Sequence, residues 1–531
     1  MDGVSRRSKL TLPLGISVAA YLIHALSYRF VCDDAFISFR YARNLVEHGE
    51  LAYNLGERVE GISNPLWTLL ISVGLVLGLD PVIWTQGIGL LAGLAVLFRL
   101  HWWMRQSWVA IRPVSSEKAL SALWNDGWSA LPVLFLAAAP GFAAWTTGGL
   151  ETTLFTLFFT LAWTDWWRDR AVPAGLWIGL CGLTRPEGSI LIAPLVIHGV
   201  FFRMGFASVA RLVCATGAVL LPALLARYAY YGHWLPNTVY AKAPAADLLG
   251  SGLYYLWRWV HVHGLYVLPI AGWWLWSSLR RWDRARAQEA RSMVFLSLGI
   301  LATFCAIIVS VGGDFMVLGR YLVPLLPLIA VLVACGGECM WERVGPRDDS
   351  LPGGSPVDRA RGHRLSLAAP LLLMILAGGA VIQRASVLKP YTSRGLASIG
   401  WLSQFVQQGE AIGAWLRATQ APGTRMAITA AGTIPFDTDF WTLDMLGLND
   451  AWIARNAASE GTRPGHRKHA PLEYLLEAEL DVIVAHPTIT ESPSWPAAGM
   501  RDEWAKRGFE WKSVRVPDLE PEWFGYWQRV Q

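Results

Sequence analysis

Cysteine is scarce in this chain of 531 residues. The sequence contains six cysteines, with no Cys-x-x-Cys pair and no cluster of cysteine with histidine. Five of the six lie inside apolar runs, where a cysteine usually serves as a small hydrophobic residue. No cysteine follows Cys339. A disulfide framework and a structural zinc site are therefore not expected.

Charge is scarce as well. Only 16% of the residues are charged and 53% are hydrophobic, whereas about a quarter of a soluble domain is charged. Apolar runs close to the roughly 20 residues that cross a bilayer recur along most of the chain. This composition excludes an ordinary soluble protein and predicts a polytopic α-helical membrane protein surrounded by lipid. The net charge of +5 lies mostly in short loops, where membrane topology explains it, so no nucleic-acid partner is expected.

The apolar runs predict about eleven transmembrane helices. They are expected near residues 10–28, 81–101, 130–146, 149–167, 173–184, 188–203, 210–228, 263–279, 293–311, 320–341 and 365–383. Residues 65–79 are apolar too, but this segment is too short to span and is bounded by Pro65 and Pro81. A helix that re-enters the membrane or lies on its surface is expected there.

The distribution of lysine and arginine sets the orientation. If the N-terminus is cytoplasmic and residues 65–79 do not span, basic clusters such as Arg280-Arg281 fall on the inside, as the positive-inside rule requires. Counting 65–79 as a span would place those clusters outside. The predicted location is the bacterial inner membrane, with the loop Gly345–Gly362 in the cytoplasm and the tail after Gln383 extracytoplasmic.

The tail has a different pattern from the rest of the chain. Segments with helical spacing alternate with short apolar strands, which predicts a small α/β domain. The helices are expected at 399–417 and 471–478, and the strands at 426–430 and 481–485. The sequence therefore predicts two domains, a transmembrane module at 1–385 and an extracytoplasmic α/β domain at 386–531.

With this topology the unusual polar segments all fall in outer loops. Asp33 and Asp34 come where the first span leaves the membrane. Adjacent carboxylates repel, so one of them should have a raised pKa unless a cation is near. A carboxylate at a membrane surface suits a general base that takes a proton from a hydroxyl group. The alternative is a pair of acids that ends a helix in water.

Two pairs of basic residues accompany these carboxylates. Arg40 and Arg43 are three residues apart and share a helix face, which suits either an ion-pair network or a phosphate site. Arg185 and Arg320 border predicted spans, where an arginine is costly unless it is paired or functional. Each of these two could neutralise a phosphate. The alternatives are ion pairs of Arg185 with Glu187 and of Arg320 with Asp314.

The remaining candidates are individually weak. Glu151 begins a helix, where the helix dipole favours an acid in any case. His233 lies beside Trp234 and could be an interfacial anchor or a platform for a sugar. The other polar candidates in the same outer loops are Glu60, Asn64, Asn237 and Lys242.

The first outer loop resembles that of the GT-C glycosyltransferases. It reads DDAFISFRYARNL at residues 33–45 and YNLGERVEGISNPLW at residues 53–67. These strings are most similar to the branch that contains the mycobacterial terminal arabinofuranosyltransferases. Further segments that look like this branch lie at 148–152, 183–188, 234–238, 313–321 and 444–450.

The resemblance implies both a fold and a reaction. GT-C enzymes take a sugar from a polyprenyl phosphate at the outer leaflet, so the expected donor is a polyprenyl-phosphate sugar, with arabinofuranose as one candidate. The acceptor would be an extracytoplasmic glycan, lipid or protein. Asp33, with Asp34 as the alternative, matches the aspartate proposed to act as the base or to orient the donor. The cations that would stabilise the leaving phosphate are Arg40, Arg185, Lys242 and Arg320. No cofactor is certain, and the resemblance leaves open a divalent cation at Asp33 and Asp34.

Two other classes of protein compete with this interpretation. A transporter or flippase of lipid-linked sugars usually places ionisable groups near the bilayer midplane and often contains repeats. Here the charges gather at span ends, and the sequence has no internal repeat. The second alternative is a non-catalytic membrane scaffold with an extracytoplasmic binding domain. Substitution of Asp33 separates an enzyme from both.

Overall fold

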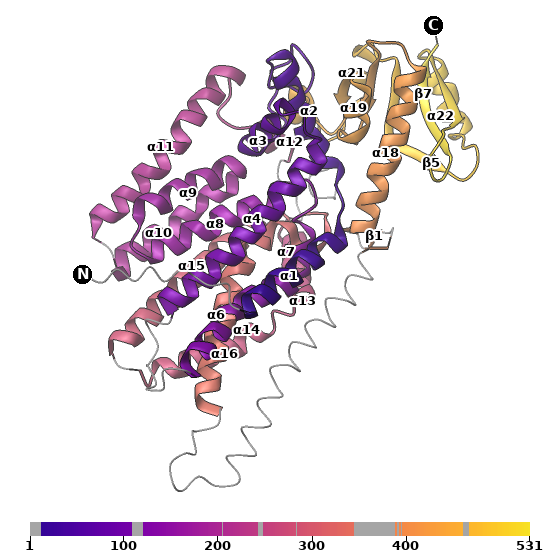
Figure 1. Cartoon of the computed structure of the whole chain (residues 1–531). Coiled ribbons are helices and arrows are strands. Elements are labelled where there is room, and N and C mark those ends of the chain that lie inside the picture. Colours follow the sequence, from indigo (N-terminus) through magenta and orange to yellow (C-terminus); the bar gives the residue numbers. More distant parts are fainter. Residues whose placement is uncertain are drawn as a thin grey trace, which may run out of the picture.

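A computed structural model describes most of the chain as a helical bundle joined to a smaller α/β domain (Figure 1). The described residues are 12–108, 120–203, 205–242, 248–282, 284–344, 388–389, 392–393, 396–459 and 467–530.

The bundle is built from α-helices and short 3-10 or π turns. Its α-helices are α1 (Leu12–Tyr28), α2 (Asp33–His48), α3 (Pro65–Val76), α4 (Pro81–Trp103), α6 (Leu120–Ala138), α7 (Pro140–Ala144), α8 (Thr152–Trp167), α9 (Ala171–Thr184), α10 (Ile192–His198), α11 (Phe206–Tyr231), α12 (Asn237–Ala241), α13 (Leu248–Val262), α14 (Val267–Leu279), α15 (Arg284–Ser310) and α16 (Leu326–Val344). The turns are η1 (Met104–Trp108), η2 (Pro186–Leu191), η3 (Gly199–Arg203) and η4 (Val317–Leu325).

Among the described residues, four helices are long and apolar enough to cross a membrane, or five if the bent pair α1–α2 counts as one span. Shorter apolar helices pack between them, so the chain is a multi-pass membrane protein with several apolar helices. The predicted total of about eleven spans stays a prediction. The predicted span at 365–383 and the predicted loop at 345–362 lie outside the described residues.

Several predicted spans are interrupted where the apolar pattern gave no sign of a break. The run predicted at 130–146 ends at Ala138, and Pro140 begins the separate helix α7, because proline lacks an N–H and is tolerated in a first turn. The run predicted at 188–203 divides into η2, α10 and η3. The predicted non-spanning segment forms α3, whose 12 residues are too few to cross a bilayer.

The first two helices meet at a sharp corner. The axes of α1 and α2 differ by 90°, and Asp33 and Asp34 occupy the first turn of α2. The positive end of the helix dipole favours acids at that position. Because α2 is charged and packs against the α/β domain, we treat it as lying outside the membrane, with α1 as the membrane-crossing part of the pair.

The C-terminal part confirms the predicted α/β domain. Its five-stranded sheet has the order β4-β3-β5-β7-β6, in which β3 is parallel to β4 and β5 while β7 is antiparallel to β5 and β6. The strands are β3 (Arg425–Ile428), β4 (Trp441–Asp444), β5 (Val482–Thr490), β6 (Phe509–Arg515) and β7 (Trp523–Arg529), preceded by the small hairpin β1 (Thr392–Ser393) and β2 (Leu396–Ala397). The helices are α18 (Ile399–Thr419), α19 (Thr433–Thr438), α20 (Ala451–Asn456), α21 (Leu472–Glu477) and α22 (Ala498–Ala505).

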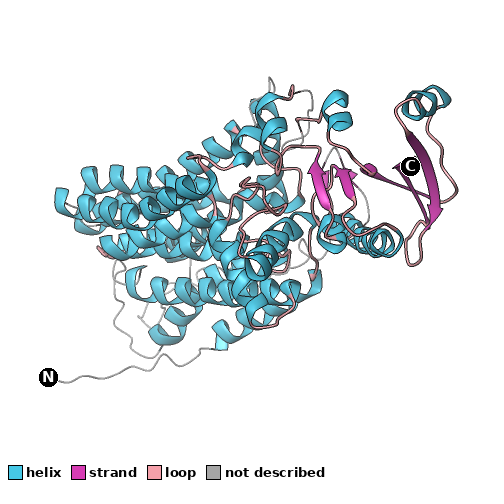
Figure 2. Cartoon of the chain, turned by 90° about the horizontal axis from the view of Figure 1, so that it is seen from above, coloured by secondary structure: helices cyan, strands magenta, loops and turns pink. Residues whose placement is uncertain are grey.

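Helix α18 belongs to two hydrophobic cores. Leu402 and Val406, in its first half, are buried in the core of the bundle. Ile412 and Leu416, in its second half, are buried against one face of the sheet. Figure 2 shows the sheet beside the bundle, with helices between them. The α/β domain is therefore packed against one end of the bundle through shared apolar contacts.

Candidate active site

A cavity of about 380 Å³ opens where the bundle meets the α/β domain. Seven of the residues predicted from the sequence line it, and they are Asp33, Asp34, Arg185, Glu187, Lys242, Asp314 and Arg320. The α/β domain contributes aromatic and basic residues to the opposite side, including Trp401, Phe405, Arg467 and His486. The structure thus gathers half of the predicted candidates, from four separate loops, around one space.

Asp33 is half-buried at the start of α2. Its Oδ1 atom accepts hydrogen bonds from the backbone N and the Oγ1 of Thr433, each 2.8 Å long. Burial raises the pKa of Asp33 to about 6, and the charge of Asp34 adds to this, while the bonds from Thr433 act in the opposite direction. A carboxylate that titrates near neutral pH is suited to general base catalysis.

Asp34 lies beside a buried arginine in the cavity wall. The Nε of Arg320 donates to Oδ2 of Asp314 at 2.8 Å, and its Nη1 lies 3.8 Å from Oδ2 of Asp34. The side chain of Asp34 is 40% exposed, against 7% for Arg320 and 3% for Asp314. Gly313 has a positive φ and packs so closely on Tyr255 that a Cβ would clash. The glycine loop thereby holds Asp314 where it can pair with Arg320.

Arg185 is held by two carboxylates. Its Nε donates to Oε1 of Glu187 at 2.6 Å and its Nη1 donates to Oε1 of Glu151 at 3.0 Å. Glu151 in turn accepts a hydrogen bond of 2.8 Å from Nδ2 of Asn64, and the guanidinium lies 4.3 Å from the ring centre of Tyr321. Glu151 and Asn64 therefore support Arg185 from behind the cavity, and the ion pair of Arg185 with Glu187 is present.

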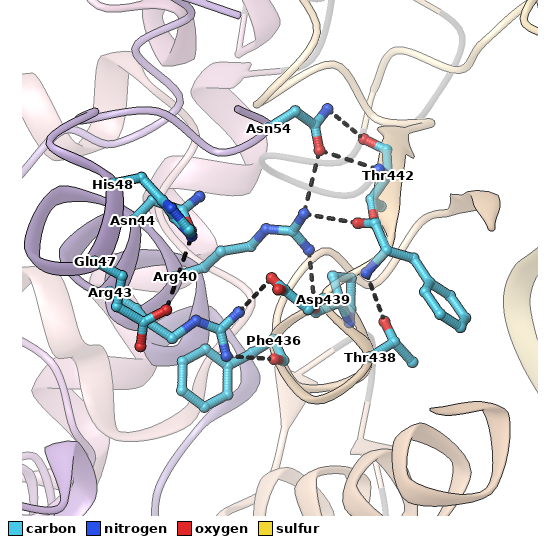
Figure 3. Close-up of polar contacts among 12 residues, drawn as sticks. Arg40, Arg43, Asn44, Glu47, His48, Asn54, Phe436, Thr438, Asp439 and Thr442 are labelled. Carbon is cyan, nitrogen blue, oxygen red and sulfur yellow. Dashed lines mark hydrogen bonds and ion pairs between the residues drawn. The ribbon is translucent and has the colours of Figure 1, made fainter. Parts of the chain in front are cut away.

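Arg40 and Arg43 do not line the cavity. Arg40 is buried and donates to the backbone oxygens of Tyr53, Pro435 and Phe440, each at 2.7 Å. Arg43 donates to the backbone oxygen of Phe436 and pairs with Asp439. Figure 3 shows both guanidiniums reaching from α2 into the segment around α19. The structure therefore places these two arginines in a joint between the bundle and the α/β domain, as a polar network.

Of the remaining candidates, all but one lie away from the cavity. Glu60 is buried and pairs with Arg227 at 2.7 Å. Asn237 donates from Nδ2 to backbone oxygens of the loop at 447–450. His233 is exposed. Of the weaker candidates only Lys242, which is exposed, reaches the cavity.

Sequence reasoning missed the contribution of the tail to the site. Thr433 contacts Asp33, and Trp401, Phe405 and His486 form a continuous ring stack along the cavity wall, with centroids 5.0 and 5.9 Å apart. These residues have no local signature, because their role depends on how the tail docks. The tail segment at 444–450, noted for its resemblance to the arabinofuranosyltransferase branch, has a structural role. Burial raises the pKa of Asp444 to about 6, and its carboxylate accepts hydrogen bonds from the backbone N atoms of Leu446 and Asn449.

The sequence left open a divalent cation at Asp33 and Asp34. Among the residues that the structure describes, no group of three or more His, Cys, Asp or Glu side chains could hold a metal ion. Asp33 is bonded to Thr433, and Asp34 faces the guanidinium of Arg320. Because Mg²⁺ can be held by one or two carboxylates together with waters and substrate phosphate oxygens, a divalent cation at Asp33 and Asp34 stays a prediction.

Comparison with known proteins gives relatives in both sequence and structure. A family model described as a domain of unknown function, DUF8728, matches residues 399–528. The terminal beta-(1->2)-arabinofuranosyltransferase of Mycobacterium tuberculosis is 26% identical over 275 residues, which cover 49% of this chain and 42% of the relative. The enzyme of the same name from Corynebacterium glutamicum is 27% identical over 356 residues, which cover 57% and 47%. The matched regions thus span less than half the length of these relatives.

The fold is similar to that of ArnT. The crystal structure of ArnT from Cupriavidus metallidurans bound to undecaprenyl phosphate matches with a TM-score of 0.60 and 14% identity, over 97% of both chains. Its apo structure matches with a TM-score of 0.58. Together with the sequence relatives, this confirms the predicted resemblance to the GT-C superfamily and its arabinofuranosyltransferase branch.

Proposed function

We propose that this chain is a membrane glycosyltransferase that moves a sugar from a polyprenyl phosphate to an extracytoplasmic acceptor. The observation that carries the proposal is a single cavity lined both by Asp33, a carboxylate with a pKa of about 6, and by the buried Arg320 beside Asp34. A base and a cation in one space are what transfer from a phosphate-linked donor needs. The names of the sequence relatives support the same reaction class.

In the proposed reaction Asp33 takes the proton of an acceptor hydroxyl. The hydroxyl oxygen forms a bond to the anomeric carbon, and the bond from that carbon to the phosphate oxygen breaks. The polyprenyl phosphate leaves with the bonding electron pair, so no general acid is required. Arg320, Arg185 and Lys242 stabilise the charge that develops on the phosphate.

The donor lipid and the sugar are assigned by analogy. Undecaprenyl phosphate in the ArnT structure supports a polyprenyl-phosphate donor. The relatives' names support arabinofuranose as the transferred sugar. The acceptor is an extracytoplasmic glycan, lipid or protein, and a panel of donors tests the assignment. Purified protein should release polyprenyl phosphate from one sugar donor far faster than from the others. Release from none, or passage of intact donor across a vesicle membrane, would contradict the proposal and favour a flippase.

The proposed topology predicts a labelling pattern. The domain after Gln383 is extracytoplasmic in the bacterial inner membrane, whereas the loop that follows α14 is cytoplasmic. In a variant without native cysteines, Asp502→Cys should react with a membrane-impermeant thiol reagent in intact cells stripped of their outer barrier. Arg281→Cys should react only after the membrane is opened. Both residues are exposed, but the proposed topology places them on opposite sides of the membrane. The reverse pattern would overturn the site assignment.

The pKa of Asp33 predicts a pH dependence. Burial raises this pKa to about 6, and the base must be ionised to take a proton. Turnover should therefore rise with pH through about 6, level off near 7, and fall about tenfold per unit below 6. The check is the turnover number between pH 4.5 and 8, with thermal unfolding at each pH as the control for stability. A flat profile across this range would contradict a base of this pKa.

A further inference from the structure

The α/β domain makes direct contact with the proposed base. Thr433 begins α19 and donates from both its backbone N and its Oγ1 to Oδ1 of Asp33. Thr433 of the tail thus holds a side chain that lies 400 positions earlier in the sequence.

The same two helices are joined at further points. Arg40 donates to the backbone oxygen of Pro435 at 2.7 Å, and Arg43 donates to that of Phe436 at 2.9 Å. The ring of Phe436 packs edge-on against Phe36, with centroids 5.5 Å apart. Figure 3 shows that both arginines point from α2 toward this segment. The joint fixes α19 along α2, so the position of Thr433 relative to Asp33 is set by several independent contacts.

The approach of the two segments leaves no space for a side chain at position 432. A Cβ on Gly432 would overlap both the backbone oxygen and the carboxylate of Asp33. Only glycine therefore lets the turn come close enough for Thr433 to donate both of its hydrogen bonds.

We propose that Thr433 is a positioning residue for Asp33, and hence that the domain matched at 399–528 completes the active site of the membrane module. This inference rests on the proposed function, in which Asp33 is the base. Hydrogen bonds to a carboxylate fix its orientation and favour its ionised form. They act against burial, which raises the pKa of Asp33. The domain at 399–528, whose family model is described only as one of unknown function, thereby contributes to catalysis by positioning the proposed base.

The test compares three threonine variants. Thr433→Val removes the hydroxyl and keeps the shape, whereas Thr433→Ser keeps the hydroxyl. Thr438→Val is the matched control, because Thr438 is also buried in α19 but its hydroxyl donates to Ile434 of its own helix. Two curves are measured for each protein. One is the pH dependence of carbodiimide labelling of Asp33, which reports the protonated carboxyl by mass spectrometry, and the other is the pH dependence of sugar transfer.

The loss of one charge-assisted hydrogen bond should move the labelling midpoint of Thr433→Val upward by about one pH unit. The acid limb of its turnover should move by the same amount, with the KM for the donor little changed. Thr433→Ser and Thr438→Val should behave like the wild type. An unchanged midpoint in Thr433→Val, or an equal shift in Thr438→Val, would overturn the inference.

A second variant addresses the backbone contacts. Gly432→Ala should lower turnover at pH 7 at least roughly tenfold while thermal unfolding still shows a folded α/β domain, because the added Cβ pushes Thr433 away from Asp33. Wild-type turnover in this variant would overturn the inference. If the labelling midpoint shifts as expected but the wild type transfers no sugar from any donor, Thr433 positions Asp33 but the proposed function fails, and with it the importance of that contact for sugar transfer.

Discussion

Asp33→Asn is expected to lower sugar transfer by about 10²–10⁴-fold, which is the usual contribution of a general base. Asparagine keeps the shape of the side chain, and its amide oxygen can still accept the hydrogen bonds that Thr433 donates to Oδ1. It can neither take a proton nor carry a negative charge. Binding of the lipid donor should change much less, because the cations of the cavity remain.

Asp34→Asn is the matched control for this substitution. Its carboxylate lies 3.8 Å from Arg320 and is 40% exposed, so its loss should be milder if its only effect is on the pKa of Asp33. Transfer and donor binding should be measured for both variants in detergent and in liposomes. Near-normal transfer by Asp33→Asn with an inactive Asp34→Asn would exchange the two roles. Near-normal transfer by both would remove the acidic pair from the mechanism.

Arg320→Gln is expected to have two large effects. It should weaken donor binding roughly 10–100-fold, because a charge-assisted bond to the phosphate is lost. It should also lower the free energy of unfolding by about 3–5 kcal/mol, because Asp314, whose side chain is only 3% exposed, is left as an unpaired buried charge. Thermal unfolding and binding of a labelled polyprenyl phosphate measure the two effects separately.

The double variant Arg320→Gln/Asp314→Asn separates the phosphate contact from the ion pair. Neutralising both partners removes the unpaired buried charge, so most of the stability should return. Donor binding should stay weak, because the cation is still missing. A double variant that binds the donor as tightly as the wild type would show that Arg320 serves only the structure.

The grouping of the cavity residues was predictable from topology. Asp33, Arg185 and Arg320 are far apart in the sequence, but loop charge placed all three at the same ends of the predicted spans. The structure confirms that they share one cavity. Charged groups at the same end of a bundle can meet even where no single motif is specific, while the predicted orientation in the membrane stays a prediction.

The partners of Arg40, Arg43 and Asp33 were not predictable. Helical spacing showed that Arg40 and Arg43 share a face, yet both an ion-pair network and a phosphate site fit that spacing. Which of the two forms depends on the docking of α19, as does the contact between Thr433 and Asp33. Docking is a long-range property, and local periodicity contains no information about it.

The predicted and observed secondary structure agree best where the spacing of apolar residues fits a single helix or strand period. The buried strands β3 and β5 and the helix α18 lie where their patterns placed them. The run at 130–146 contains Pro132 and Pro140, and the helix continues through the first proline but breaks before the second. Helix breaks of this kind depend on backbone hydrogen bonds, which hydrophobicity does not report.

Transfer of a labelled sugar tests the central claim most directly. Purified protein in liposomes is given the best polyprenyl-phosphate donor of the panel together with isolated cell envelopes, which supply glycan, lipid and protein acceptors. Wild-type protein should move the label to envelope material and release polyprenyl phosphate in equal amount, and Asp33→Asn should do so about 10²–10⁴-fold more slowly. Equal transfer by the two proteins, or no transfer by the wild type from any donor of the panel, would contradict the account.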